Sequence, residues 1–251
     1  FSVTNTAIDA DNGDTNNIAW SFDSGTNSAF DFLAAGETLV LEYTILVSDN
    51  AKTTDTQIVT VTITGANDIP VISVGANDHD TAAINETNAV ITAQGTLTVV
   101  DADLSNTVNA EVDSLSVKDT STFDGNNPLS LDDLMAMFSV TNTAIDADNG
   151  DTNNIAWSFD SGTNSAFDFL AAGETLVLEY TILVSDNAKT TDTQIVTVTI
   201  TGANDKPTIT ATNVAGDITE GVTLNDVGSI TFADLDLTDR PTATEATKSI
   251  S

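Results

Sequence analysis

Residues 57–70 decide the fold: Gln57-Ile-Val-Thr-Val-Thr-Ile-Thr64 is followed directly by Gly65-Ala-Asn-Asp68-Ile-Pro70. Apolar side chains at positions 59, 61 and 63 alternate with threonines, and this period of two places them on one face of a half-buried β-strand. Gly65 then breaks the strand, and Pro70 forces the residue before it into an extended conformation. We therefore predict a strand that ends in a short, stiff linker.

The same β pattern extends outward in both directions. Alternating apolar residues predict further strands at residues 18–22, 38–48, 71–74 and 95–100. Clusters of Asp, Asn, Gly, Ser and Thr separate these runs at the spacing typical of β-sandwiches. The sequence therefore predicts an all-β fold.

Two short segments are predicted to be helical. In residues 130–137, Ser130 is a candidate N-cap and acidic residues occupy the first turn. A single helical turn is expected at residues 32–35, where Gly36 ends it. Because both segments are so short, they do not change the expected fold class.

An internal repeat sets the organisation of the chain. Residues 1–68 recur without a change as residues 138–205, an offset of 137 residues. We therefore predict tandem β-sandwich repeats with a 137-residue unit. On this division, 1–68 is the C-terminal half of one repeat, 69–205 is a complete repeat and 206–251 is the N-terminal part of the next. Because Phe1 falls inside a repeat, we expect the sequence to be a piece of a longer protein, with any export signal outside it.

Composition excludes several classes of function. The chain of 251 residues has 38 acidic and 6 basic residues, a net charge of −32. Such a charge repels phosphate, so we expect no nucleic-acid partner, and no apolar run is long enough for membrane insertion. There is no cysteine, which excludes disulfides, thiolate zinc sites and a cysteine nucleophile. Most of the acids are Asp, the short carboxylate that suits turns and calcium loops.

Acidic residues recur in the same order around each linker. An Asn-Asp-x-Pro sequence at residues 67–70 and 204–207 is followed by a Glu and then by an Asp-x-Asp after a strand. Calcium takes six to eight oxygen ligands in irregular geometry, so a linker and the acids of the following repeat could form one shell. The alternative is that these acids are solvated turn residues. The predicted calcium ligands are Asn67, Asp68, Glu86, Asp101, Asp103, Asn204, Asp205, Glu220, Asp234 and Asp236.

These residues resemble a known family. Ala34-Ala-Gly-Glu-Thr-Leu39, the run from Thr56 to Asp68 with Pro70, and Leu97-Thr-Val-Val-Asp-Ala-Asp103 are similar to VCBS-type, cadherin-like repeats of giant bacterial RTX adhesins exported by type I secretion. The resemblance implies Ig-like or cadherin-like sandwiches that act extracellularly, at the bacterial cell surface, as extenders which calcium rigidifies. This sequence departs from the family's pattern at two places. It has a lysine in the turn 49–55, and it has Ile69 or Lys206 where the cadherin linker has a second Asn.

Other signals point to weaker hypotheses. Asp9-Ala-Asp-Asn-Gly-Asp14, repeated at 146–151, is a candidate calcium loop, although Trp20 stands where an EF-hand needs its Glu. The Thr row at 60, 62 and 64 could bind ice or glycan, or simply be a solvent face. His79 is the one histidine, and no nucleophile elbow or phosphate loop accompanies it, so we expect no enzyme.

The sequence thus predicts a calcium-stiffened spacer that serves cell adhesion and biofilm formation by projecting a distal binding domain. The alternative is a carbohydrate- or surface-binding module that uses loops or the Thr-rich face. The expected partners are calcium ions and neighbouring repeats of the same chain. Because residues 206–251 lack the strands that residues 1–68 carry, head-to-tail association of these half-domains is also expected.

Overall fold

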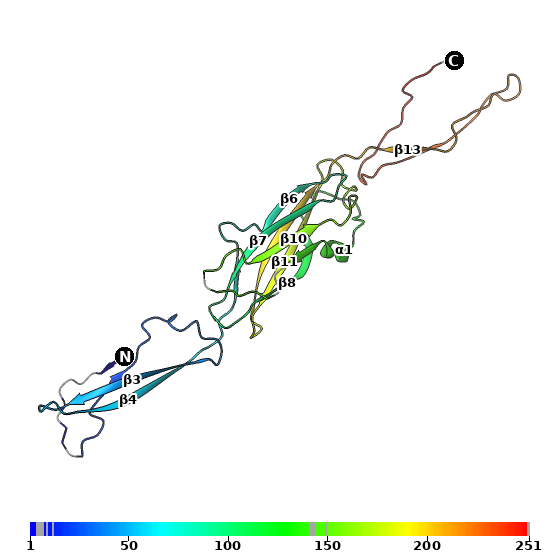
Figure 1. Ribbon diagram of the computed structural model, residues 1–251. Helices are drawn as coiled ribbons and strands as arrows, with labels where there is room; N and C mark the ends of the chain where they lie inside the picture. Colours follow the sequence, from blue (N-terminus) through cyan, green and yellow to red (C-terminus); the bar gives the residue numbers. More distant parts are fainter. Residues whose placement is uncertain (4–7, 9, 12, 141–143, 149, 250–251) are drawn as a thin grey trace.

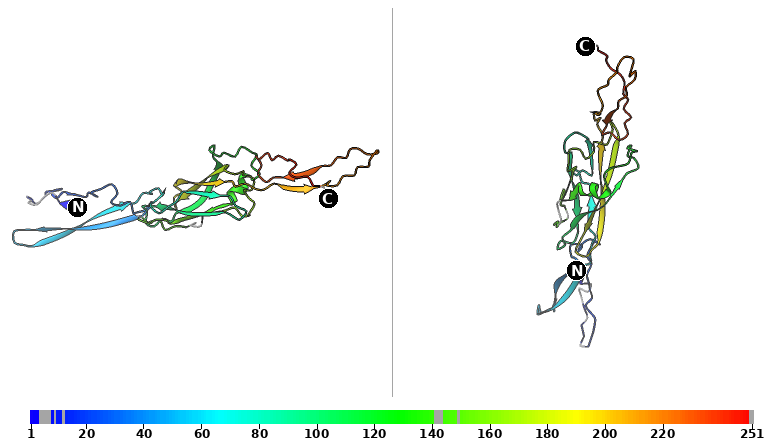
Figure 2. Two further views of the ribbon diagram at one scale, coloured as in Figure 1. Left: turned by 90° about the horizontal axis from the view of Figure 1, so that it is seen from above. Right: turned by 90° about the vertical axis from the view of Figure 1, so that its right-hand side faces the viewer.

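The chain is an elongated row of three parts in a computed structural model that describes residues 1–3, 8, 10–11, 13–140, 144–148 and 150–249 (Figure 1). A long hairpin near the N-terminus, a central sandwich and a second hairpin near the C-terminus follow one another along the axis. The further views show the same arrangement, with the two hairpins at opposite ends of the molecule (Figure 2). The two ends are therefore far apart.

The central sandwich consists of two four-stranded sheets. One sheet joins, in order, β5 (Val71–Ser73), β7 (Thr92–Val100), β10 (Ile155–Asp160) and β9 (Phe138–Val140). The other joins β6 (Thr81–Asn85), β12 (Thr191–Thr201), β11 (Thr175–Ser185) and β8 (Asn109–Val117). All pairs are antiparallel except β6 with β12, which are parallel. The predicted all-β sandwich is confirmed.

The core lies between the sheets and follows from the period-two pattern. Inward residues of β11 and β12 are buried while their neighbours are partly exposed. Phe138 stacks between two rings, with its centroid 5.6 Å from that of Trp157 and 4.2 Å from that of Tyr180. Gly95 lies against this indole, because a Cβ at Gly95 would meet the Trp157 ring at 2.5 Å.

A short helix, α1 (Leu131–Ala136), closes one edge of the core. The Ser130 hydroxyl accepts a hydrogen bond from the Asp133 N–H, and the Asp133 carboxylate accepts one from the Ser130 N–H. This capping box confirms the predicted helix and its N-cap. The helical turn expected at residues 32–35 is wrong. Two hydrogen-bonded turns, Phe30 to Leu33 and Ala34 to Glu37, take its place, and Gly36 adopts a φ of 83° within the second of them.

Replacing Tyr180 by Phe should destabilise the sandwich by about 1–2 kcal/mol. The Tyr180 hydroxyl is fully buried and donates to the Leu134 carbonyl oxygen at 2.8 Å, so its loss leaves that carbonyl without this partner. Burial also raises the Tyr180 pKa. The repeat supplies a matched control, because Tyr43 occupies the identical sequence position but no segment equivalent to α1 lies against it among the described residues. Tyr43→Phe should leave the urea unfolding curve unchanged, and equal losses from both variants would contradict this account.

The outer parts of the chain contain strands of the same kind as the sandwich, but each of these strands pairs with only one other strand. Near the N-terminus, β3 (Thr38–Ser48) pairs only with β4 (Thr54–Thr64), and β1 (Ser2–Val3) with β2 (Trp20–Ser21). Near the C-terminus, β13 (Thr208–Ala211) pairs with β14 (Ile230–Ala233). The predicted strands are therefore confirmed, although the one expected at 18–22 is shorter than its copy β10.

Candidate metal centre

Two acidic clusters lie at the two ends of the central sandwich. We call Asn67, Asp68, Asp101, Asp103 and Asp186 the first junction cluster, and Glu86, Asp168, Asp205 and Asp236 the second junction cluster. Each cluster combines residues of the sandwich with residues of an adjoining hairpin or linker. The two clusters face the N-terminal and C-terminal hairpins, respectively.

The second junction cluster gathers three carboxylates from distant parts of the chain. One oxygen each of Glu86, Asp168 and Asp205 lies within 4.8 Å of the other two. Asp236 joins them, because its carboxylate accepts a hydrogen bond of 3.0 Å from the Asp205 N–H. A calcium ion with ligands at about 2.4 Å holds opposite oxygens about 4.8 Å apart, so these three oxygens fit around one ion.

Strand direction explains why these residues meet. Because β6 runs parallel to β12, with Asn85 opposite Thr201, Glu86 emerges at the same end of the sandwich as the linker. Its carboxylate there accepts a hydrogen bond from the Ala203 N–H at 3.2 Å. Asp168 is fixed by its neighbours Phe167 and Phe169, whose buried rings anchor the loop between β10 and β11. Asp236 follows β14.

The second junction cluster carries buried oxygens that accept no hydrogen bond from the described residues. These atoms are Glu86 Oε1, Asp168 Oδ1, Asp205 Oδ2 and Asp236 Oδ1. Burial raises the pKa of Glu86, and the charges of the other three carboxylates raise this pKa further, against a lowering by the Ala203 hydrogen bond. Burial likewise raises the pKa values of Asp168 and Asp236, with nearby carboxylates adding to the effect. Unpaired, mutually repelling carboxylates are costly, and a cation among them would remove the cost.

The first junction cluster is built around the Asp-x-Asp turn after β7. Asp101 Oδ1 accepts a hydrogen bond from the Asp103 N–H, and Asp103 Oδ2 accepts one of 2.9 Å from the Asp68 N–H in the linker. Asp101 Oδ2 and Asp103 Oδ1 remain without a partner among the described residues. Burial raises the pKa values of both carboxyls, and neighbouring acids including Asp186 raise them further. This end therefore also concentrates unneutralised charge.

Asp186 is fully buried in the turn that joins β11 to β12. Its carboxylate accepts hydrogen bonds from the Thr190 N–H at 2.8 Å and from the Asn67 side-chain amide at 2.8 Å. Burial raises the Asp186 pKa, but the bonds from Thr190 and Asn67 outweigh it, so the net pKa is lowered. This turn contains Lys189 at a φ of 68°, the lysine that distinguishes it from the resembling family. The residue that contributes to the cluster is the Asp at its start.

The structure groups the predicted ligands differently from the sequence order. Asn67, Asp68, Asp101 and Asp103 do come together, and so do Asp205 and Asp236. Glu86 does not join the linker that precedes it but lies at the far end, because β6 carries the chain across the sandwich. Glu220 is exposed in a turn after β13. Asn204 is exposed, and its amide donates to the Asp205 carbonyl, while Asp234 accepts from the Asp236 N–H.

Sequence reasoning missed Asp168 and Asp186. Asp168 stands in a Phe-Asp-Phe sequence and is buried with the two aromatics that flank it, and an acid set between two core aromatics was an available signal. Asp186 directly follows the long alternating strand of β11, but nothing in the sequence places it beside Asn67, which lies 119 residues earlier. Only the pairing of the sheets brings them together.

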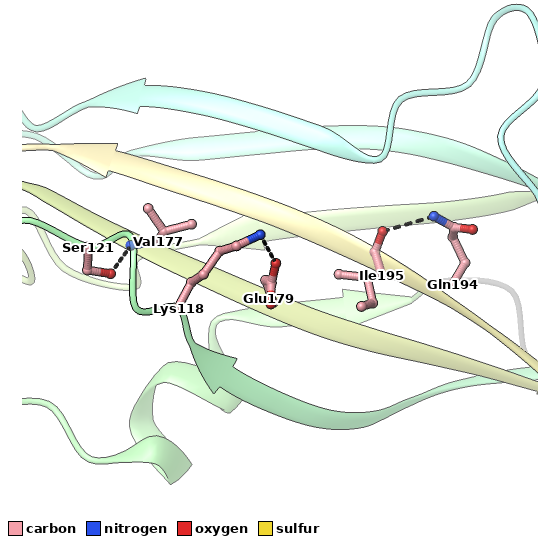
Figure 3. Close-up of polar contacts among 6 residues, drawn as sticks. All are labelled: Lys118, Ser121, Val177, Glu179, Gln194 and Ile195. Carbon is pink, nitrogen blue, oxygen red and sulfur yellow. Dashed lines mark hydrogen bonds and ion pairs between the residues drawn. The ribbon is translucent and has the colours of Figure 1, made fainter.

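Basic side chains do not neutralise these clusters. Among the described residues the single ion pair joins Lys118 to Glu179 on the outer face of the sheet, away from both junctions (Figure 3). In the same region the Ser121 hydroxyl accepts from the Val177 N–H, and the Gln194 amide donates to the Ile195 carbonyl (Figure 3). The clusters therefore offer hard oxygen ligands only, a donor set that suits calcium.

The structure gives less support to the other candidate binding residues of the sequence analysis. The loop at residues 9–14 and its copy at 146–151 lie partly outside the described residues, at positions 9, 12 and 149. His79 is exposed as expected, and its carbonyl accepts from the Trp157 indole N–H. The Thr row reappears on β12, where Thr197 lies opposite Thr81 of β6, so the hydroxyl-bearing face is part of a four-stranded sheet.

Comparisons with known proteins give no family assignment. No protein-family model and no curated protein matches the chain. The solved CooA pilin subunit from enterotoxigenic Escherichia coli aligns with 55% of this chain and 100% of the pilin, at 11% identity and a TM-score of 0.32. A protocadherin gammaB7 EC3-6 cis-dimer structure aligns with 78% of this chain and 43% of its own, at 12% identity and a TM-score of 0.34. Protocadherin gamma B2 extracellular cadherin domains 1–5 align with 79% and 32%, at 12% identity and 0.30.

This chain thus spans less than half of the protocadherin chains it matches. TM-scores this low carry no functional argument, and the fold class rests on the sheets described above. Within the described residues, no helix combines the length and the apolar character that crossing a bilayer requires.

Proposed function

We propose that this chain is a calcium-stiffened extender segment of a bacterial cell-surface adhesin, of the VCBS-type, type I secreted kind that the sequence resembles. The observation that supports the proposal is the second junction cluster, where a linker carboxylate, two carboxylates of the sandwich and one of the following segment converge with unpaired buried oxygens. Repeats joined in this way would project a distal binding domain from the cell, in adhesion and biofilm formation.

The mechanism is electrostatic. Without a cation, Glu86 and the neighbouring Asp carboxylates repel one another, and the repulsion is relieved when the adjoining segment swings away. Calcium would be held by Glu86, Asp168, Asp205 and Asp236 at the second junction, and by Asp68, Asp101, Asp103 and Asp186 at the first. Its charge would convert repulsion across the linker into attraction and fix the angle between neighbours.

Two backbone hydrogen bonds support the idea that the junctions are repeated structural devices. The Leu104 N–H donates to the Phe32 carbonyl at the first junction, and the Leu237 N–H donates to the Phe169 carbonyl at the second. Both donors follow an Asp-x-Asp, and both acceptors follow an Asp, Asp31 or Asp168, at identical positions of the repeat. One backbone hydrogen bond therefore spans each linker at the same positions of the repeat.

Small-angle scattering of residues 1–251 with calcium and with a chelator tests this proposal. With calcium at about 10 mM, roughly 10 to 100 times the dissociation constant of typical extracellular modules, both junctions should be filled. We expect a larger maximum dimension and a narrower distance distribution in calcium than in chelator. Magnesium at equal concentration is the control for screening, because it demands stricter octahedral geometry. Identical scattering in all three conditions would exclude a stiffening role.

A further inference from the structure

The chain enters and leaves the central sandwich at opposite ends. It arrives through the linker 67–70 at the first junction and departs through the linker 204–207 at the second, and the two outer hairpins extend from these ends in opposite directions (Figure 1). Tension along an extender therefore acts on the sandwich between these two linkers. The strands that follow the first linker and precede the second decide how well the sandwich resists it.

The strands β6 and β12 form the one parallel pair of the described sandwich, over five residues of each strand. Two printed ends of this ladder are short: the Thr197 N–H donates to the Asp80 carbonyl at 2.8 Å, and the Glu86 N–H donates to the Thr201 carbonyl at 2.7 Å. Tension from the two linkers pulls β6 at its first residue and β12 at its last. Because the strands are parallel, these pulls slide one strand along the other, so all bonds of the ladder carry the tension at once.

Asp78 fixes the segment that joins β5 to β6. It is 8% exposed, and its carboxylate accepts hydrogen bonds from the Gly75 N–H at 2.8 Å, the Thr96 hydroxyl at 2.8 Å, the Thr98 hydroxyl at 2.6 Å and the Asn153 side-chain amide at 2.6 Å. Burial raises the Asp78 pKa, but these bonds outweigh it and lower the net pKa, so the bonds are of the strong, charge-assisted kind at neutral pH. Tension that detaches β5 from β7 therefore meets this carboxylate before it reaches β6.

We infer that the β6–β12 ladder and the Asp78 carboxylate form a mechanical clamp, a set of bonds that keeps the sandwich folded while the chain is pulled along its axis. The inference rests on the proposed extender role only for the source of the tension. It needs no ion, because every bond of the clamp joins two groups of the protein, so its tests in chelator are independent of the calcium-dependent scattering. Forced unfolding is governed by the unfolding rate, so the clamp lengthens the lifetime of the sandwich under tension.

Single-molecule pulling of residues 1–251 in chelator tests the clamp with two attachment geometries. The chain has no cysteine, so a pair of introduced cysteines defines where the force is applied. Ile69→Cys with Lys206→Cys, both at exposed linker positions, pulls β6 and β12 in opposite directions along the ladder. Thr87→Cys with Lys206→Cys pulls the same strands apart from one end, so the bonds break one after another. We expect the first geometry to unfold at several times the force of the second, and an equal or lower force would overturn the inference.

Asp78→Asn tests the contribution of the carboxylate. An amide keeps one acceptor oxygen, and each oxygen of Asp78 accepts two of the bonds, so two donors lose their acceptor. Force applied between residues 69 and 206 passes through this residue, whereas force applied between residues 87 and 206 does not. We expect a lower unfolding force in the first geometry and an unchanged force in the second. An equal fall in both geometries, or no fall in either, would overturn the role assigned to Asp78.

A pair of proline variants tests the ladder itself. The Glu86 N–H faces β12, and alternate residues of a strand face the same way, so the Ala82 N–H also faces β12 while the Ala83 N–H faces the open edge of the sheet. At a fixed force between residues 69 and 206, Ala82→Pro should unfold roughly five-fold faster, the effect of one lost hydrogen bond. Ala83→Pro is the matched control and should unfold at close to the unmodified rate.

Equal unfolding rates for the two proline variants would overturn the inference, because the ladder bonds would then carry none of the tension. Should Ala82→Pro not fold, the comparison of the two attachment geometries decides the question, since it changes only exposed positions outside the ladder.

Discussion

Replacing Asp168 by Asn should change stability in opposite directions with and without calcium. In chelator the variant should be more stable, by on the order of 1 kcal/mol, because a charge leaves a cluster of buried, unpaired carboxylates. The new amide can also donate to Glu86 or Asp205. In calcium the variant should lose roughly 1.4–2.7 kcal/mol, the binding free energy of one ion at 10 to 100 times its dissociation constant. Thermal melts with and without calcium measure both effects.

Opposite changes in stability with and without calcium would distinguish a metal site from an ordinary acidic surface. Asp113→Asn makes the same change of charge on the exposed face of β8, far from both clusters. We expect it to shift the melting temperature by less than about 1 °C in either condition, since exposed charges interact weakly. A variant at Asp168 that behaves like this control would mean that the second junction cluster binds no ion.

The sequence was informative wherever one strand could be judged alone. The alternation in 38–48 and 57–64 predicts β3 and β4 to within a few residues, and Ser130 with Asp133 predicts the cap of α1. These features depend on neighbours within a few positions. The strands β6 and β8 were not predicted because their alternation is interrupted by small and polar residues, and they are held in place by the longer strands β12 and β11.

The sequence named most residues of the candidate site but did not predict which of them lie together. The linker acids and the Asp-x-Asp lie on short loops whose positions follow from the strand ends, so their meeting could be foreseen. Glu86 was expected at the first junction and lies at the second, because the parallel pairing of β6 with β12 cannot be read from local sequence. Asp186 and Asn67 meet over 119 residues of chain for the same reason. Sheet topology, not residue type, was the missing information.

In chelator, stability should rise as the pH falls from about 7 toward about 5. Burial and neighbouring charges raise the pKa values of Glu86, Asp101, Asp103, Asp168 and Asp236 in the folded chain above the ordinary 3.8 for Asp or 4.5 for Glu. A group of this kind contributes stability that is complete below its unfolded pKa and is lost as the pH rises through its folded pKa. Five such groups act together, so neutral pH without calcium is the least favourable condition.

Calcium should invert this dependence. An ion held by ionised carboxylates competes with protons, so the calcium-dependent increment is largest at neutral pH and shrinks on acidification. Asp78 and Asp186 oppose the trend only at lower pH, because hydrogen bonds outweigh burial and lower their pKa values, and their contributions are lost below 3.8. Melts from pH about 7 to about 5 stay above the isoelectric point near 4.1, where loss of net charge promotes precipitation. The two stability curves should converge toward the acidic end, and parallel curves would show that the raised pKa values and the calcium site belong to different residues.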